Sequence, residues 1–124
     1  MKIATFNING IKARLPALLD WLSETMPDIA MLQEIKSVDE LFPREEIEAL
    51  GYQIHTHGMK GFNGVAILSK YPLEDIMRGL PGDSDDIQTR YIEATVITNK
   101  GPLRLCNLYL PNGNPTPGPK FDYK

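Results

Sequence analysis

Two short apolar segments joined by one amphipathic helix constrain the fold of this chain more than any other feature. Residues 2–6 and 28–32 each lack a strand breaker and have the length of a buried strand. Between them, leucines recur at the spacing of one helix face, at Leu15, Leu18, Leu19 and Leu22. A strand, a helix and a second strand of these lengths form a βαβ unit whose two strands run parallel and side by side. The sequence therefore predicts an α/β fold.

The segments that follow predict antiparallel strands and one short helix. Residues 53–57 and 65–69 read as a hairpin, and residues 90–98 and 103–110 read as a second hairpin around a tight turn. A segment rich in Pro, Gly and Asp (71–86) reads as a short strand and a long loop, and residues 39–50 read as a helix that Gly51 ends. The predicted architecture is a mixed sheet with helices on one side.

Polar side chains follow both strands of the βαβ unit. Asn7 and Asn9 end the first strand, and Glu34 comes directly after the second. Because the carboxyl ends of parallel strands meet at one edge of a sheet, we expect the two amides to lie beside the glutamate. A carboxylate at the end of a buried strand is costly unless it meets a cation or several donors. This edge is a candidate metal site; two turn asparagines and an exposed loop acid are the alternative.

Three further features were considered as sites. His55 and His57 share a strand face, but no Cys or third His stands at a supporting distance, so ordinary polar strand positions are favoured over a metal pair. The glycine-rich loop 58–64 precedes no helix, which excludes the common phosphate-loop mechanisms, although Lys60 on its rim could contact a polyanion. A tyrosine, Tyr109, and several asparagines lie close together in sequence at the end of the last strand, as polar residues do at the ends of the first two strands.

Net charge and cysteine content limit which cellular compartment and which binding partners suit this chain. The net charge is −3, so binding to nucleic acid would require a local basic surface or a metal. The single cysteine, Cys106, excludes an internal disulfide and is expected to be a buried thiol in a reducing, cytoplasmic compartment. The chain shows no signal-peptide core and no apolar run of about 18 residues, the length that suggests a membrane span.

Five segments in register resemble the exonuclease III family of bacterial apurinic/apyrimidinic endonucleases, within the endonuclease/exonuclease/phosphatase superfamily. They are residues 6–11, 32–36, 61–69, 90–92 and 107–113, and the resemblance runs from Met1 to Lys124. It implies a DNase I-like, four-layered α/β sandwich of which residues 1–124 are the N-terminal half, so that the chain stops within the domain. On this interpretation the second sheet is missing and the inner face of the first sheet is bare.

The resemblance also implies a role for individual residues. Glu34 resembles the principal Mg²⁺ or Mn²⁺ ligand of the family, with Asn9 near the metal, and Asn7 and Tyr109 resemble catalytic residues that hold the phosphate or the attacking water. The expected DNA contacts are Lys36, Lys60, Asn63, Arg90 and Asn112. The implied partner is double-stranded DNA with abasic sites or 3′ ends, and the implied reaction is hydrolysis of a phosphodiester bond.

The chain differs from the family in length. The family's second half supplies an Asp-x-Asn pair and a Ser-Asp-His segment, and neither motif occurs in these 124 residues. We therefore expect the missing C-terminal half to be needed for activity and the fragment alone to be inactive. Two other functions stay open: a superfamily phosphatase or phosphodiesterase acting on a lipid or small molecule, and a non-enzymatic association module that dimerises through its bare sheet face.

Overall fold

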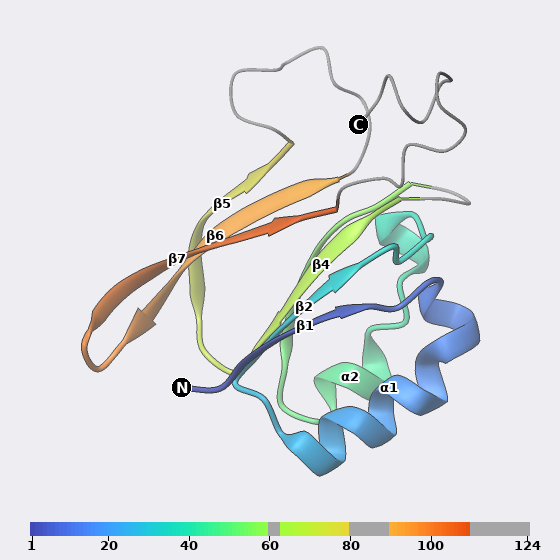
Figure 1. The fold of residues 1–124 in the computed structure, drawn as a ribbon, viewed down its shortest axis with the longest axis horizontal. Coiled ribbons are helices and arrows are strands. Elements are labelled where there is room, and N and C mark those ends of the chain that lie inside the picture. Colours follow the sequence, from blue (N-terminus) through green and yellow to red (C-terminus); the bar gives the residue numbers. More distant parts are fainter. Residues whose placement is uncertain (60–62, 80–89, 110–124) are drawn as a thin grey trace.

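The chain folds into two β-sheets packed face to face, with helices on the outer face of one sheet (Figure 1). The computed structural model describes residues 1–59, 63–79 and 90–109. The first sheet contains, in spatial order, β1 (Ile3–Asn7), β2 (Ile29–Gln33), β4 (Val65–Ser69) and β3 (Gln53–His57). The second contains β5 (Leu73–Arg78), β6 (Tyr91–Thr98) and β7 (Gly101–Leu108). The helical elements are α1 (Ile11–Thr25), the 3-10 turn η1 (Asp39–Leu41) and α2 (Glu45–Glu48).

The predicted βαβ unit is confirmed. β1 and β2 are parallel neighbours, in a register that pairs Ile3 with Ile29 and Asn7 with Gln33. The connecting helix α1 buries Ile11, Leu18 and Leu22 against the sheet, as its leucine spacing predicts. Both hairpins are also present as antiparallel pairs, β3 with β4 and β6 with β7.

The single helix predicted over residues 39–50 is wrong in part, because the structure divides it into η1 and α2. The break falls at Phe42, whose backbone is extended (φ −63°, ψ 131°). Proline disfavours the helical conformation for the residue before it, and Pro43 follows Phe42 directly.

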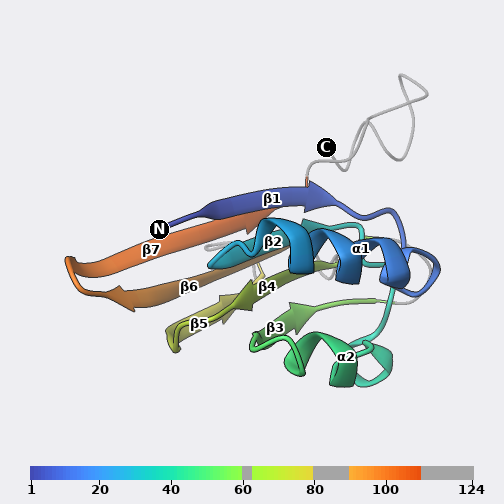
Figure 2. The ribbon, with the colours of Figure 1, turned by 90° about the horizontal axis from the view of Figure 1, so that it is seen from below.

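The expectation that the chain lacks a second sheet is wrong. The inward residues of β6, Ile92, Ala94 and Val96, form one fully buried cluster with Ile29, Val65 and Ile67 of the first sheet. Viewed from below, the layers are helices, first sheet and second sheet (Figure 2). The inner face of the first sheet is therefore covered, and the association module that depended on a bare face loses its basis.

The sandwich is open along one side. β1 and β7 are each one of the two edge strands of their sheet, both lie on this side, and no strand of the described ranges pairs with their outer edges (Figure 2). Apolar side chains are exposed along them, with Ile3 at 40%, Leu103 at 41% and Leu108 at 48%. On the opposite side, the Arg78 Nε of β5 donates to the Thr56 carbonyl of β3 at 2.7 Å and joins the two edges.

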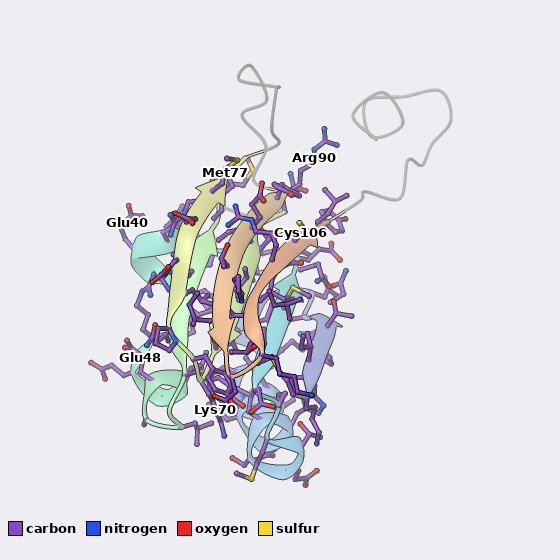
Figure 3. All side chains as sticks on the ribbon, turned by 90° about the vertical axis from the view of Figure 1, so that its left-hand side faces the viewer. Glu40, Glu48, Lys70, Met77, Arg90 and Cys106 are labelled. Atoms are coloured by element: carbon purple, nitrogen blue, oxygen red, sulfur yellow. The ribbon has the colours of Figure 1, made fainter. Side chains whose placement is uncertain are left out.

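Cys106 is exposed, which corrects the expectation of a buried thiol. Its neighbours Leu105 and Asn107 point into the space between the sheets, so the alternation of a strand turns Cys106 to the outer face (Figure 3).

A buried carboxamide ties the two sheets together. Asn107 of β7 is 2% exposed, and its Nδ2 donates to the carbonyls of Leu32 and Ala66 in the first sheet, at 2.9 Å each. Its Oδ1 accepts from Gln33 Nε2 at 2.7 Å. A polar side chain in this position is tolerated because both of its polar atoms find partners.

Replacing Asn107 with leucine, which keeps the branching at Cγ, should destabilise the chain by about 1–3 kcal/mol, because two donors to buried carbonyls disappear. Urea unfolding followed by circular dichroism measures this loss. The exposed neighbour on the same strand provides the control, since Cys106→Ala should change the unfolding free energy by less than about 0.5 kcal/mol. Equal stability of the two variants would contradict a tethering role for Asn107.

Candidate functional site

Asn7, Asn9, Glu34 and Tyr109, which were singled out in the sequence, lie at one rim of the sandwich, where β1, β2 and β7 end. Past β1 the chain continues beside the end of β2, with Ile8 N donating to the Gln33 carbonyl at 3.0 Å and Gly10 N donating to the Glu34 carbonyl at 2.8 Å. This path buries Ile8 and leaves Asn7 and Asn9 exposed on either side of it. The predicted placement of the two amides beside the glutamate segment is what the structure shows.

The backbone at this rim is left-handed at several residues that are not glycine. Asn9, Glu34, Lys36 and Asn63 have φ values of 48°, 54°, 51° and 57°. Asparagine adopts this conformation readily, but for glutamate and lysine it costs roughly 1–2 kcal/mol. Strain of this kind persists only where the surroundings impose it, and it is concentrated at functional sites.

Neighbouring segments hold Glu34 and Lys36 in this left-handed conformation through backbone hydrogen bonds. Lys36 N donates to the Asn63 carbonyl at 2.9 Å, and Ile35 N donates to the Gly64 carbonyl at 3.2 Å. Gly64 permits this approach, because a Cβ atom there would lie 2.4 Å from Ile35 Cγ1. The loop that carries the Glu34 carboxylate is therefore held in place by hydrogen bonds to its neighbours.

The amide side chains have partners of their own. Asn7 Oδ1 accepts from Asn9 N at 3.1 Å, and Asn9 Oδ1 accepts from the Lys36 ammonium at 2.5 Å. A cation coordinated by Asn9 Oδ1 would have to displace this ammonium. Lys36 itself is half-buried at the rim, where its positive charge faces the amides.

Tyr109, which follows the last strand of the second sheet, β7, lies at the same rim as Glu34. Its backbone N donates to the Arg90 carbonyl at 2.8 Å. Burial, the nearby Glu34 carboxylate and a hydrogen bond to that carboxylate raise the pKa of the Tyr109 hydroxyl above its usual value. The hydroxyl therefore stays protonated at neutral pH and is available as a donor beside Glu34.

The other predicted residues are placed as follows. Arg90 directly precedes β6 and is half-exposed, and its carbonyl accepts from Tyr109 N, which places it at the same end of the molecule. Asn63 is only 6% exposed, and its Nδ2 lies 3.7 Å from Met59 Sδ, so its side chain faces the protein. Lys60 and Asn112 lie outside the described residues.

The two histidines lie on β3, at the far edge of the first sheet from β1. Burial and then the charges of Arg78 and Arg44 lower the pKa of His55, and the same two guanidinium groups disfavour a metal cation there. Within residues 1–59, 63–79 and 90–109, no three His, Cys, Asp or Glu side chains are grouped so as to hold a metal. Among the described residues, Glu34 is the carboxylate on which a metal at the rim would depend.

Gln33 and Asn107 belong to the site but were not predicted to. Gln33 occupies the last position of β2, and its side chain reaches Asn107 of the second sheet. A signal was available in the sequence: strand alternation places Asn107 on the inward face with Leu105, where an amide needs a partner. The sequence does not indicate which residue that partner is.

None of the helices in the described residues is long and apolar enough to cross a membrane.

Comparison with known proteins agrees with this geometry. Residues 4–123 match the model of the endonuclease/exonuclease/phosphatase family. The exodeoxyribonuclease III of Haemophilus influenzae is 46% identical over 91% of this chain, which spans 42% of that protein. A Neisseria 3′ phosphatase, NExo, solved with a product DNA hairpin, superposes with a TM-score of 0.90 at 40% identity, over 99% of this chain and 46% of that one.

An AP endonuclease from Archaeoglobus fulgidus superposes with a TM-score of 0.89 at 36% identity, again over 99% of this chain and 46% of the other. These solved folds confirm the DNase I-like architecture, and the chain spans less than half the length of the relatives it matches. The family match covers nearly the whole sequence. The chain therefore belongs to the endonuclease/exonuclease/phosphatase family.

Proposed function

We propose that residues 1–124 form the N-terminal half of a Mg²⁺-dependent DNA-repair nuclease of the exodeoxyribonuclease III type, which hydrolyses phosphodiester bonds. The observation that carries the proposal is the meeting of the Glu34 carboxylate and the Tyr109 hydroxyl at one rim, from two different sheets. Two of the relatives, an exodeoxyribonuclease III and an AP endonuclease, support the assignment.

The residues at the rim fit a hard divalent cation. Mg²⁺ takes oxygen ligands, keeps several waters and is commonly held by one or two carboxylates together with substrate phosphates. Glu34 supplies one partly exposed carboxylate, which meets that requirement, and Asn9 would join it only if Lys36 withdraws. When bound, Mg²⁺ or Mn²⁺ neutralises charge on the phosphate and assists the leaving oxygen.

The chain's own groups would hold the phosphate. The Tyr109 hydroxyl, protonated at neutral pH, would donate to a phosphate oxygen or to the attacking water. The exposed Asn7 amide lies on the same rim and would act as a second donor. Asn7 is the last residue of β1 and Tyr109 directly follows β7, so both dipoles are attached to the ends of strands.

Binding to DNA would depend on local cations, because the whole chain is acidic. Lys36 and Arg90 lie at the rim, and Lys60 and Asn112 complete the proposed contacts. Asn63 would join them only if its side chain, which faces the protein, turned outward. Such contacts reach phosphates and not base edges, so the affinity should fall with salt and show little sequence preference. The substrates would be abasic sites and 3′ ends in double-stranded DNA.

The longer protein that contains these residues should incise a duplex with a single abasic site, and excess EDTA should abolish the cleavage, because the Glu34 carboxylate is itself negative and the charge of the phosphate is offset by the bound cation. Gel electrophoresis of an end-labelled duplex measures this, and added Mg²⁺ should restore it. Cleavage that persists in excess chelator would refute metal dependence, whereas turnover of a phosphoinositide and not of abasic DNA would favour the phosphatase alternative.

Glu34→Gln should lower kcat/KM for abasic DNA by about 100-fold or more, because it removes the carboxylate that the described residues bring to the rim while preserving the size of the side chain. The Mg²⁺ concentration for half-maximal activity should rise in the same assay. Glu48→Gln is the matched control, since Glu48 lies exposed on α2. Equal activity of the two variants would remove Glu34 from the mechanism.

A further inference from the structure

We propose that Gln33 is a positioning residue, whose carboxamide sets the spacing between Glu34 of the first sheet and Tyr109 of the second. The geometric part of this inference stands on hydrogen bonds between described residues. Its catalytic consequence rests on the proposed nuclease function.

The link lies next to both residues that it would position. Gln33 immediately precedes Glu34, and Asn107 stands two residues before Tyr109. The 2.7 Å hydrogen bond from Gln33 Nε2 to Asn107 Oδ1 therefore joins the two segments that deliver the site. The Asn107 bonds to the Leu32 and Ala66 carbonyls also join the sheets near the rim, but Gln33 is the partner that lies directly beside Glu34. The Arg78–Thr56 bond joins the sheets at the opposite edge.

The orientation of both amides follows from their surroundings. Asn107 Nδ2 has two hydrogens, and two carbonyl oxygens, those of Leu32 and Ala66, receive them. Asn107 must then present its oxygen to Gln33, which in turn must present its NH₂ group. Three acceptors surround Gln33 Nε2: Asn107 Oδ1, the Thr5 hydroxyl at 2.8 Å and the Met31 carbonyl at 3.2 Å. A donor is required at this point.

The apolar contact between the sheets does not by itself supply this precision. Hydrophobic packing is non-directional, so it does not orient two polar groups toward each other. A catalytic constellation has to be held within about 0.5 Å, and a misplacement of about 1 Å can lower the rate 100-fold. The chain of Thr5, Gln33 and Asn107 gives the sheets a fixed register where Glu34 and Tyr109 meet.

Two substitutions of Gln33 test the inference on the 124-residue chain without metal or DNA. Gln33→Glu keeps the shape but places a carboxylate against three acceptors, and Gln33→Met keeps the approximate volume without any polar group. Gln53→Glu is the control, because Gln53 is exposed on β3 of the same sheet and receives the same change of charge. Heteronuclear NMR reports the fold, and nuclear Overhauser effects between the Tyr109 ring and the Glu34 side chain report their contact.

The contact should be lost in both Gln33 variants and retained in Gln53→Glu, while the backbone spectrum away from the rim stays unchanged. If Gln33→Glu does not fold, Gln33→Met decides. A Tyr109–Glu34 contact that persists in a folded Gln33→Met chain overturns the inference.

The longer nuclease provides the second readout. Gln33→Met should lower kcat for abasic DNA by about 10- to 100-fold and change KM by less than about 3-fold, because the phosphate contacts remain and only the reacting geometry is lost. An unchanged kcat, or a change confined to KM, overturns the positioning role. If the wild-type protein cleaves no DNA, the proposed function fails, and the NMR contact alone decides the role of Gln33.

Discussion

The candidate site depends on the face-to-face packing of the two sheets, because Glu34 follows a strand of the first sheet and Tyr109 follows a strand of the second. Ile29, Val65 and Ile67 meet the inward residues of β6 in a continuous buried cluster. Apolar burial of this kind supplies most of the free energy that holds the layers together. The buried amide of Asn107 adds the direction that such packing lacks, so the core provides cohesion and the carboxamides provide alignment.

Sequence periodicity predicted the elements well and their assembly less well. The parallel βαβ rule placed Asn7 and Asn9 beside Glu34 before any coordinates, since two connected strands have only one common arrangement. Alternation in residues 91–98 predicted a hairpin but could not distinguish a hairpin that extends the first sheet from one that stacks on it. Cys106 shows a different failure: residue type favoured burial, while the alternation beside Leu105 correctly pointed outward.

The rim combines stable support with unfavourable local conformation. Glu34 and Lys36 hold left-handed backbone that glycine would adopt at lower cost, and the flanking segments 8–11 and 63–64 keep them there. Their side chains explain why larger residues occupy these positions, since the carboxylate faces Tyr109 and the ammonium faces Asn9. Local stability is exchanged here for a defined arrangement of charge, as is common where function requires it.

The two open edge strands bear on how this chain behaves at high concentration. An unpaired strand edge is a template for another chain, and natural sheets limit it with short strands, charges or proline. β1 has only five residues, and Pro102 in β7 lacks a backbone donor, but Ile3, Leu103 and Leu108 leave apolar surface along both edges. The solubility of residues 1–124 should therefore be limited by edge-to-edge aggregation through β1 and β7, while the buried core between the sheets stays intact.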